Sequence, residues 1–263
     1  MFGSKSNYDS HFFVNGEQIS GVTAVDISYD NAPAIINPLG YHKGLVSVGG
    51  STKQTVSVSR SLMCNTPLDS LTTQGQNFSG SLNYEGASYG FQSGYMVSSS
   101  VNCAVGAMPT TNYSLVIYDE LRSGANASGN ETSSIHIPSQ GSISVTADNV
   151  TSNRVLGFDY SQEFKYKPYY TIGSETPVDV KYISPTTYNA SVQLEVDDAM
   201  PESGHTFLTS GKNGGRLITL VVDGKDGVNI QSYTVPNAVL TSEKLSASSN
   251  GSLRLTLNYV GHQ

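Results

Sequence analysis

The residues closest to catalytic or metal-binding chemistry are two adjacent carboxylates, Asp197 and Asp198 in "VDDAM". Paired carboxylates can hold a cation or act as the acid and base of a hydrolase. These two follow a segment of alternating apolar and polar residues, and adjacent side chains of a strand point to opposite faces. The pattern therefore favours a solvated strand end over a shared site.

The histidines also lack the spacing of a site. They are His11, His42, His136, His205 and His262, and none belongs to an HExxH or similar metal-binding motif. No phosphate-binding loop, nucleophile elbow or kinase signature is present. We therefore expect no catalytic, cofactor-binding or metal-binding residues, and a protein that is not an enzyme.

The two cysteines, Cys64 and Cys103, lie on separate predicted segments. The favoured interpretation is two small buried thiols. A disulfide would need their strands to be neighbours and an oxidising compartment.

Composition favours a mainly β protein. The 263 residues are 37% hydrophobic and 13% charged, with no Trp and a net charge of −7. Such an acidic chain is not suited to binding nucleic acid phosphates or anionic membranes nonspecifically. No apolar run is long enough for a membrane helix, and the first residues lack a secretory signal pattern. These features predict a protein retained in a cytoplasm, unless a leader has been removed.

Strict alternation predicts half-buried antiparallel strands. The segments are "QTVSVSR" with Val56 and Val58 on one face, "NYSLVIYD" with Tyr113, Leu115 and Ile117, "ASVQLEVDD" with Val192, Leu194 and Val196, and "SLRLTLNYV" with Leu253, Leu255, Leu257 and Tyr259. "RLITLVVDG" is continuously apolar and predicts a central strand. Short helices are expected only in "NTPLDSLTTQG", where Thr66 would cap and Pro67 would open the helix, and in "MPESGHTFLTSG" after Pro201.

The order of these elements occurs twice, which predicts a duplicated module. The paired positions are Val22 and Val155 at a separation of 133, Pro67 and Pro201 at 134, Val56 and Val192 at 136, Gln92 and Gln231 at 139, and Leu115 and Leu255 at 140. The predicted organisation is a first module at 1–121, a polar linker or exposed loop at 122–134, and a second module at 135–263.

Several phrases resemble virion structural proteins of tailed bacteriophages, and the tandem β arrangement resembles their tail tube proteins. The phrases are "FFVNGEQISGVTAVDISYD", "TVSVSRSLMCNTPLDSLTT", "YGFQSGYMVSSSVNCAVGAMPTTNYSLVIYD" and "IPSQGSISVTAD". The resemblance implies that each module is a β-sandwich or split barrel with one short α-helix. It implies that six modules form a ring and that rings stack into a tube for DNA. Two fused modules would close the ring as a trimer with pseudo-sixfold symmetry, whereas the commonest subunit has one module.

The resemblance also implies partners. They are further copies of the chain, other tail proteins such as the baseplate, tape measure or sheath, and DNA that passes without sticking; no membrane is expected. The protein would be assembled in the host cytoplasm and reside in the virion tail. An acidic lumen would repel phosphates, and the long loops at 30–52 and 168–187 would supply contacts between rings. Alternatives are a baseplate hub, tube initiator or distal tail protein. From other classes, they are an attachment or capsid-decoration protein that binds host glycan or capsid, and a secreted or cell-surface two-domain sandwich protein.

Overall fold

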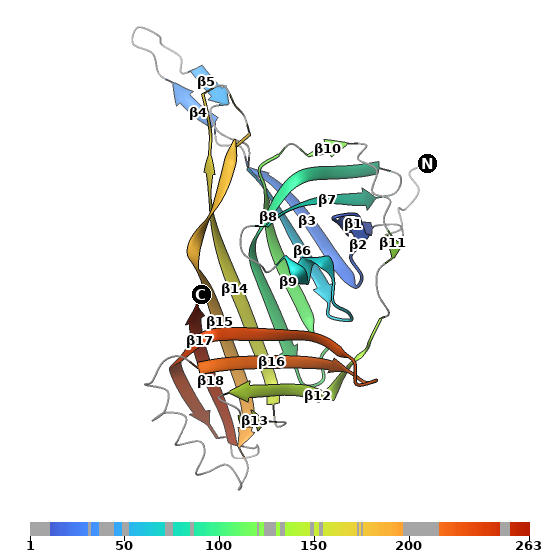
Figure 1. The fold of residues 1–263 in the computed structure, drawn as a ribbon, viewed down its shortest axis with the longest axis vertical. Helices are drawn as coiled ribbons and strands as arrows, with labels where there is room; N and C mark the ends of the chain where they lie inside the picture. Colours follow the sequence, from blue (N-terminus) through green and yellow to red (C-terminus); the bar gives the residue numbers. More distant parts are fainter. Residues whose placement is uncertain are drawn as a thin grey trace.

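The chain folds almost entirely into antiparallel β-strands (Figure 1). The computed structural model describes residues 11–30, 33–36, 45–48, 53–71, 76–84, 87–119, 121–123, 130–131, 135–147, 150–152, 155–172, 174, 176–196, 216–247 and 253–263. The elements of the first half are β1 (His11–Val14), β2 (Glu17–Gln18), β3 (Val22–Asp30), β4 (Pro33–Ile36), β5 (Leu45–Val48), β6 (Lys53–Ser61), α1 (Pro67–Ser70), β7 (Asn77–Tyr84), β8 (Ala87–Ala104) and β9 (Thr110–Ile117). The later ones are β10 (Arg122–Ser123), β11 (Asn130–Glu131), β12 (Pro138–Ala147), β13 (Val150–Ser152), β14 (Val155–Tyr169), β15 (Asp179–Val196), β16 (Arg216–Gly224), β17 (Asn229–Ser246) and β18 (Leu253–His262). The mainly β prediction is confirmed.

The strands of each half are paired in the same order. In the first half the order is β3-β6-β9-β8-β7-β1-β2, and in the second it is β14-β15-β18-β17-β16-β12-β13. The long strands β8 and β17 each pair with one neighbour through their first residues and with another through their last. Each long strand therefore belongs to two layers, which cross each other in Figure 1.

Apolar side chains fill the space between the layers of each half. Val56, Val58 and Leu115 are fully buried in the first half, and Val192 and Leu257 are almost fully buried in the second. Burial of such alternating faces is the main favourable contribution to folding, at roughly 25 cal/mol per Å² of apolar surface. The alternating strands predicted from the sequence are confirmed, although the side chain of Val196 lies outside the described residues.

The predicted central strand is β16, which pairs with β12 on one side and β17 on the other. Its side chains nevertheless alternate in burial: Ile218, Leu220 and Val222 are fully buried, whereas Leu217 is 57% exposed. The strand is thus central in its pairing, but it does not have two buried faces.

The first predicted helix is present as α1, preceded by Thr66 and opened by Pro67. The second predicted helix falls outside the described residues. The expected linker at 122–134 contributes two short strands: β10 pairs with β8, and β11 pairs in parallel with β2.

The expectation of a long loop at 168–187 was wrong. β14 and β15 remain paired as far as Tyr169 and Asp179, so most of this segment is a two-stranded extension of the sheet. In the loop expected at 30–52, β4 and β5 form a separate hairpin. Both hairpins lie at the upper end of the molecule in Figure 1.

Cys64 and Cys103 are both buried free thiols, as favoured from the sequence. Burial raises the pKa of the Cys103 thiol to about 11. In the described part of the chain, no helix has the length and hydropathy needed to cross a membrane.

Candidate assembly edges

The two halves are joined by one continuous β ladder, the seam between β8 and β14. The paired residues run from Ser98 with Glu163 to Ala104 with Gly157, in antiparallel register. This seam links the four-stranded layer β3-β6-β9-β8 to the four-stranded layer β14-β15-β18-β17. The result is an eight-stranded layer that begins at β3 and ends at β17.

Side chains from each half cross the seam into the core of the other. Val101 and Cys103 of β8, together with Leu62, pack in the same buried cluster as Phe158 of the second half. In the reverse direction, Phe164 of β14 packs in the core of the first half. Val101 is only 2% exposed because β14 covers it.

The irregularities of the ladders occur at matching places in the two halves. The β3–β6 register shifts between Val22 and Ala24, and the β14–β15 register shifts between Val155 and Gly157. The β8–β9 register shifts between Met96 and Ser98. Its counterpart in β17–β18 lies between Leu240 and Ser242. Bulges are specific features of a fold, so their repetition at matching places can be used to align the strands of one half with those of the other.

These matches define a residue correspondence between the halves. The separation is 133 for β3 and β14 (Val22 to Val155), 134 for β6 and β15 (Arg60 to Leu194), and 144 for β8 with β17 and β9 with β18 (Met96 to Leu240, Leu115 to Tyr259). The 133 separation agrees with the sequence comparison. The 144 separation, however, makes Pro236 the residue equivalent to Gln92, where the sequence comparison had chosen Gln231. The sequence alignment of the later strands was therefore wrong by four to five residues.

In the part of the chain that the structure describes, each end of the eight-stranded layer has an unpaired edge. Among the described residues, β3 pairs only with β6, and Val239–Ser246 of β17 pairs only with β18. Unpaired edges are templates for pairing with another chain.

The open edges carry exposed apolar side chains at positions that the seam buries. Leu245 corresponds to Val101, and it is 60% exposed where Val101 is 2% exposed. Ile27 corresponds to Tyr160, and it is 37% exposed where Tyr160 is 5% exposed. The higher exposure thus coincides with edges that have no neighbouring strand among the described residues, and the side chains themselves are apolar as in the seam.

The face of the eight-stranded layer turned away from the cores carries mainly small polar side chains, several of which bond to each other between strands, and charged ones such as Glu195 and Arg254. The bonds are Ser59 Oγ to Asn112 Oδ1 at 2.7 Å, Asn102 Nδ2 to Asp159 Oδ1 at 2.5 Å, Asn189 Nδ2 to Ser161 Oγ at 3.4 Å, and Asn258 Nδ2 to Ser242 Oγ at 2.7 Å. We call this surface the small-polar face.

The small-polar face is hollowed near the seam by a groove of about 410 Å³. Its lining includes Ser100, Asn102, Asp159, Ser161, Asn189, Ser191 and Asn258, and of all its lining residues only Asp159 is charged at neutral pH. The surface is thus concave there, and its lining is mostly uncharged.

A buried polar cluster fixes the end of β6 against β9 and α1. Arg60 Nη2 donates to Asp69 Oδ2 at 3.0 Å and to the Cys64 carbonyl at 2.8 Å. Asp69 also accepts hydrogen bonds from the Thr66 amide at 2.8 Å and from the Tyr113 hydroxyl. Burial opposes the charge on Arg60, but Tyr113 and Asp69 raise its pKa above the ordinary value. The cluster has no sequence signature, because its members lie up to 53 residues apart, from Arg60 to Tyr113.

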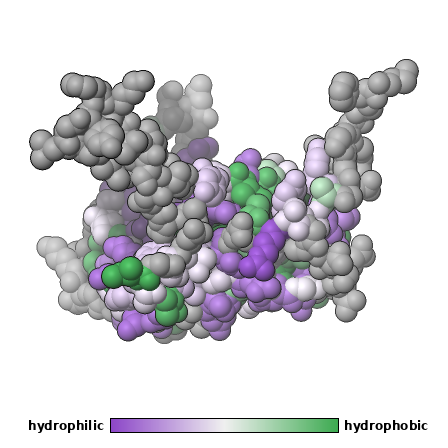
Figure 2. Space-filling model, turned by 90° about the horizontal axis from the view of Figure 1, so that it is seen from above, coloured by the Kyte–Doolittle hydropathy of each residue, from purple (hydrophilic) through white to green (hydrophobic). Residues whose placement is uncertain are grey.

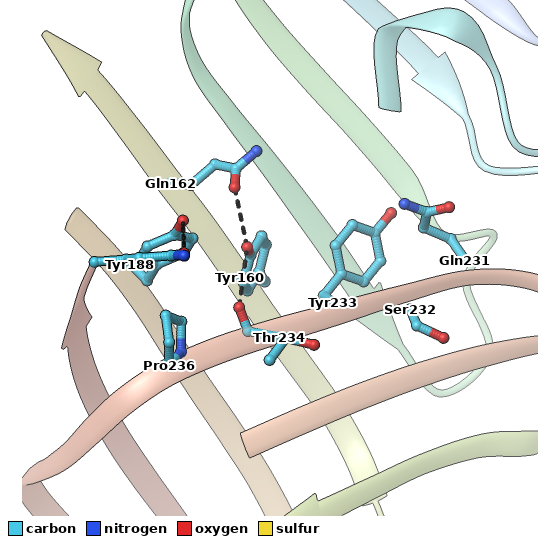
Figure 3. A pocket seen from close by; sticks show the side chains of 9 residues that line it. Tyr160, Gln162, Tyr188, Gln231, Ser232, Tyr233, Thr234 and Pro236 are labelled. Atoms are coloured by element: carbon cyan, nitrogen blue, oxygen red, sulfur yellow. Dashed lines mark hydrogen bonds between the residues drawn. The ribbon is translucent and has the colours of Figure 1, made fainter. Parts of the chain in front are cut away.

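A second cavity, of about 440 Å³, lies between β14, β15 and β17 (Figure 3). Tyr160, Tyr188 and Tyr233 line it together with several amide and hydroxyl side chains. The Tyr160 hydroxyl donates to Gln162 Oε1 at 3.1 Å. Gln162 Nε2 is buried and has no hydrogen-bond partner among the described residues.

The arm formed by the ends of β14 and β15 carries apolar side chains in solvent. Ile172 is fully exposed, Val178 is 67% exposed and Tyr169 is 42% exposed. The ammonium groups of Lys167 and Lys181 lie 5.3 and 5.2 Å from the Tyr169 ring centroid. Figure 2, which views the molecule from this end, shows hydrophobic patches separated by hydrophilic surface.

Only some of the residues singled out for chemistry lie in the part of the chain that the structure describes. Asp197, Asp198, His42 and His205 lie outside the described residues. His136 Nδ1 pairs with Asp226 Oδ2 at 2.5 Å on the surface, and this bond lowers the pKa of Asp226. The described residues contain no cluster of three or more potential metal ligands. No family model matches the chain, and no curated protein was found to be similar to it.

Proposed function

We propose that the chain is two copies of one β module and serves as a structural subunit of a phage tail tube. The single observation that carries the proposal is the shared strand order and register of the two halves, joined edge to edge and open at both outer edges. A chain that joins two of its own modules in this way has the edges needed to join further copies in the same way.

A closed ring is the assembly that leaves no edge of this layer unpaired. In a monomer, β3 and the end of β17 would both stay exposed. An open filament would still expose one such edge at each of its ends, and exposed edges favour uncontrolled aggregation. Closure of the eight-stranded layers around an axis gives a barrel without edges. Three chains supply six four-stranded units, which is the pseudo-sixfold trimer implied by the resemblance to tail tube proteins.

The small-polar face is the surface we assign to the channel. The groove at the seam opens on this face, and the apolar cores lie on the other side of the layer. Its hydroxyl and amide groups are largely bonded to each other. Lys244 and Arg254 lie on this face together with acidic residues such as Glu195, which pairs opposite Arg254. In the described part of this face, no unbroken row of positive charge is then available to hold DNA phosphates through counterion release, so a genome can slide past.

The experiment that tests this proposal is electron microscopy of the purified protein, combined with mass measurement of the assembled material. Threefold rings or stacked tubes with a central channel are expected. A monomer at every concentration, or a ring of six chains, would contradict it. The related roles of tube initiator, baseplate hub or distal tail protein predict single rings that do not extend into tubes alone.

One observation favours a second candidate function, an attachment protein that binds host glycan. The cavity in Figure 3 is lined by tyrosine rings and by amide and hydroxyl side chains, the groups that stack on sugars and bond to their hydroxyls. Glycan-array binding that is lost in Gln162→Leu, by a protein that forms no rings, would favour this function over the tube.

A further inference from the structure

We propose that copies of this chain join through an antiparallel ladder between β17 of one copy and β3 of the next, in the register of the internal seam. The inference rests on the proposed function, since it specifies the joint by which the rings would close. It commits to one partner, a second copy of the chain, and to named pairs of residues.

The register follows from the correspondence between the halves. In the seam, Val101 pairs with Tyr160, and Asn102 pairs with Asp159. Adding 144 to a residue number of β8 gives the equivalent residue of β17, and subtracting 133 from a number of β14 gives the equivalent residue of β3. This places Leu245 opposite Ile27 and Ser246 opposite Asp26. In the same ladder, Glu243 lies opposite Tyr29, Lys244 opposite Ser28, and Ala247 opposite Val25.

The paired side chains are complementary on both faces of this ladder. On the core side, Leu245 meets Ile27, so two exposed apolar side chains cover each other as Val101 and Tyr160 do in the seam. A directly opposed apolar pair of this kind contributes roughly 0.2–1 kcal/mol, in addition to the burial of its surface.

Glu243 gives this edge an unmet polar requirement. Its Oε2 is buried and accepts no hydrogen bond among the described residues. Tyr29, which is 57% exposed, would lie opposite, so its hydroxyl could donate to the Glu243 carboxylate once that side chain turns toward the joint. On the small-polar face, Lys244 would lie diagonal to Asp26, an attractive pair of charges. Both relationships depend on the register, because a shift by one residue turns each side chain to the other face.

The test uses two variants with one added cysteine each, Ile27→Cys and Leu245→Cys, mixed before assembly and then treated with a short thiol crosslinker. Wild-type protein is the background control, because Cys64 and Cys103 are buried. The matched register control is Ser28→Cys mixed with Leu245→Cys, which places the thiols on opposite faces of the ladder. Electron microscopy of each mixture before crosslinking records whether rings are present.

The expected result is a crosslinked two-chain product from Ile27→Cys with Leu245→Cys, at least tenfold more abundant than in the Ser28→Cys control. Rings that crosslink only in the control mixture, or in neither, overturn the β17–β3 joint and leave the tube standing. Crosslinked pairs without rings support the joint and contradict the tube. Uncrosslinked monomers overturn both.

Discussion

Asn102 on β8 donates a 2.5 Å hydrogen bond to Asp159 Oδ1 on β14, so the two halves bond through side chains as well as backbone. The corresponding positions at the open edges are Ser246 and Asp26, a hydroxyl and a carboxylate. The outer edges therefore keep a donor and an acceptor where the seam has them. A solitary two-module protein would have no use for this complementarity, whereas a ring uses it at every joint.

Replacement of an exposed apolar residue at the open edge is expected to prevent assembly. Leu245→Asp would place a carboxylate where the proposed joint buries a leucine. Burying this carboxylate in the joint costs far more free energy than leaving it exposed in the monomer. We expect at least a tenfold loss of association in sedimentation experiments. The melting temperature of the monomer should change little, because surface substitutions are usually within about 0.5 kcal/mol.

Leu217→Asp is the matched control for that variant. Leu217 is exposed to a similar extent, but β16 already has neighbours on both sides. It should assemble like the wild type. Equal loss of assembly in both variants would mean that any added charge disturbs the assembly, and the open edge would have no special role.

The buried ion pair predicts a large loss of stability when one partner is removed. Arg60→Leu leaves Asp69 buried without its guanidinium, so we expect the free energy of unfolding to fall by about 3–5 kcal/mol in urea titrations. The corresponding residue of the second half is Leu194, which shows that this position accommodates leucine in an apolar setting.

The double variant Arg60→Leu with Asp69→Leu tests the cause. It removes both charges, so it should be more stable than Arg60→Leu alone. If it is less stable by the sum of two independent losses, the pair is not coupled and the hydrogen bonds of Asp69 to the helix turn are the more important contribution.

Much of the fold could be predicted from local sequence, because half-buried strands alternate strictly. Val56, Val58, Leu255 and Leu257 are buried as the pattern indicated. The recurrence of Val22 at Val155 was also readable, because the strands β1 to β3 and β12 to β14 correspond without a gap.

The later correspondence could not be read in the same way. The strand pairing gives a separation of 138 between equivalent residues of β7 and β16 (Gly80 to Ile218), but 144 between those of β8 and β17. The β16–β17 hairpin is therefore six residues longer than the β7–β8 hairpin. The Gln-Ser of residues 92 and 231 recurs by composition and drew the alignment away from this insertion. The open edges were also hidden, since Leu245 and Val101 look alike until their neighbours are known.

Alkaline pH is expected to destabilise the fold through Cys103. Burial raises its pKa to about 11, whereas an unfolded thiol titrates near 8.5. Between these values the unfolded chain releases a proton that the folded chain keeps, so the free energy of unfolding falls as pH rises. The decline from this group extends over the interval between about pH 8.5 and pH 11.

Cys103→Ala isolates that contribution. Urea titrations at several pH values from 8 to 11 should show a shallower decline for the variant than for the wild type. The remaining decline includes the tyrosines whose pKa values burial also raises, which are Tyr113, Tyr118, Tyr160, Tyr188 and Tyr233. Identical slopes for variant and wild type would show that Cys103 titrates alike in both states.

The arm at the end of β14 and β15 is expected to act in stacking and not in ring closure. Ile172 is fully exposed at its tip, far along the ladder from the seam residues Gly157 to Glu163. Ile172→Asp should therefore leave single rings intact while shortening or abolishing tubes, because a carboxylate would have to be desolvated between rings. Ile137→Asp, which changes an isoleucine that is 67% exposed outside the arm, is the matched control and should form tubes of ordinary length. Electron microscopy that counts rings and measures tube lengths distinguishes the outcomes. Full-length tubes from Ile172→Asp would exclude its side chain from stacking, and loss of the rings themselves would place the arm in the ring joint.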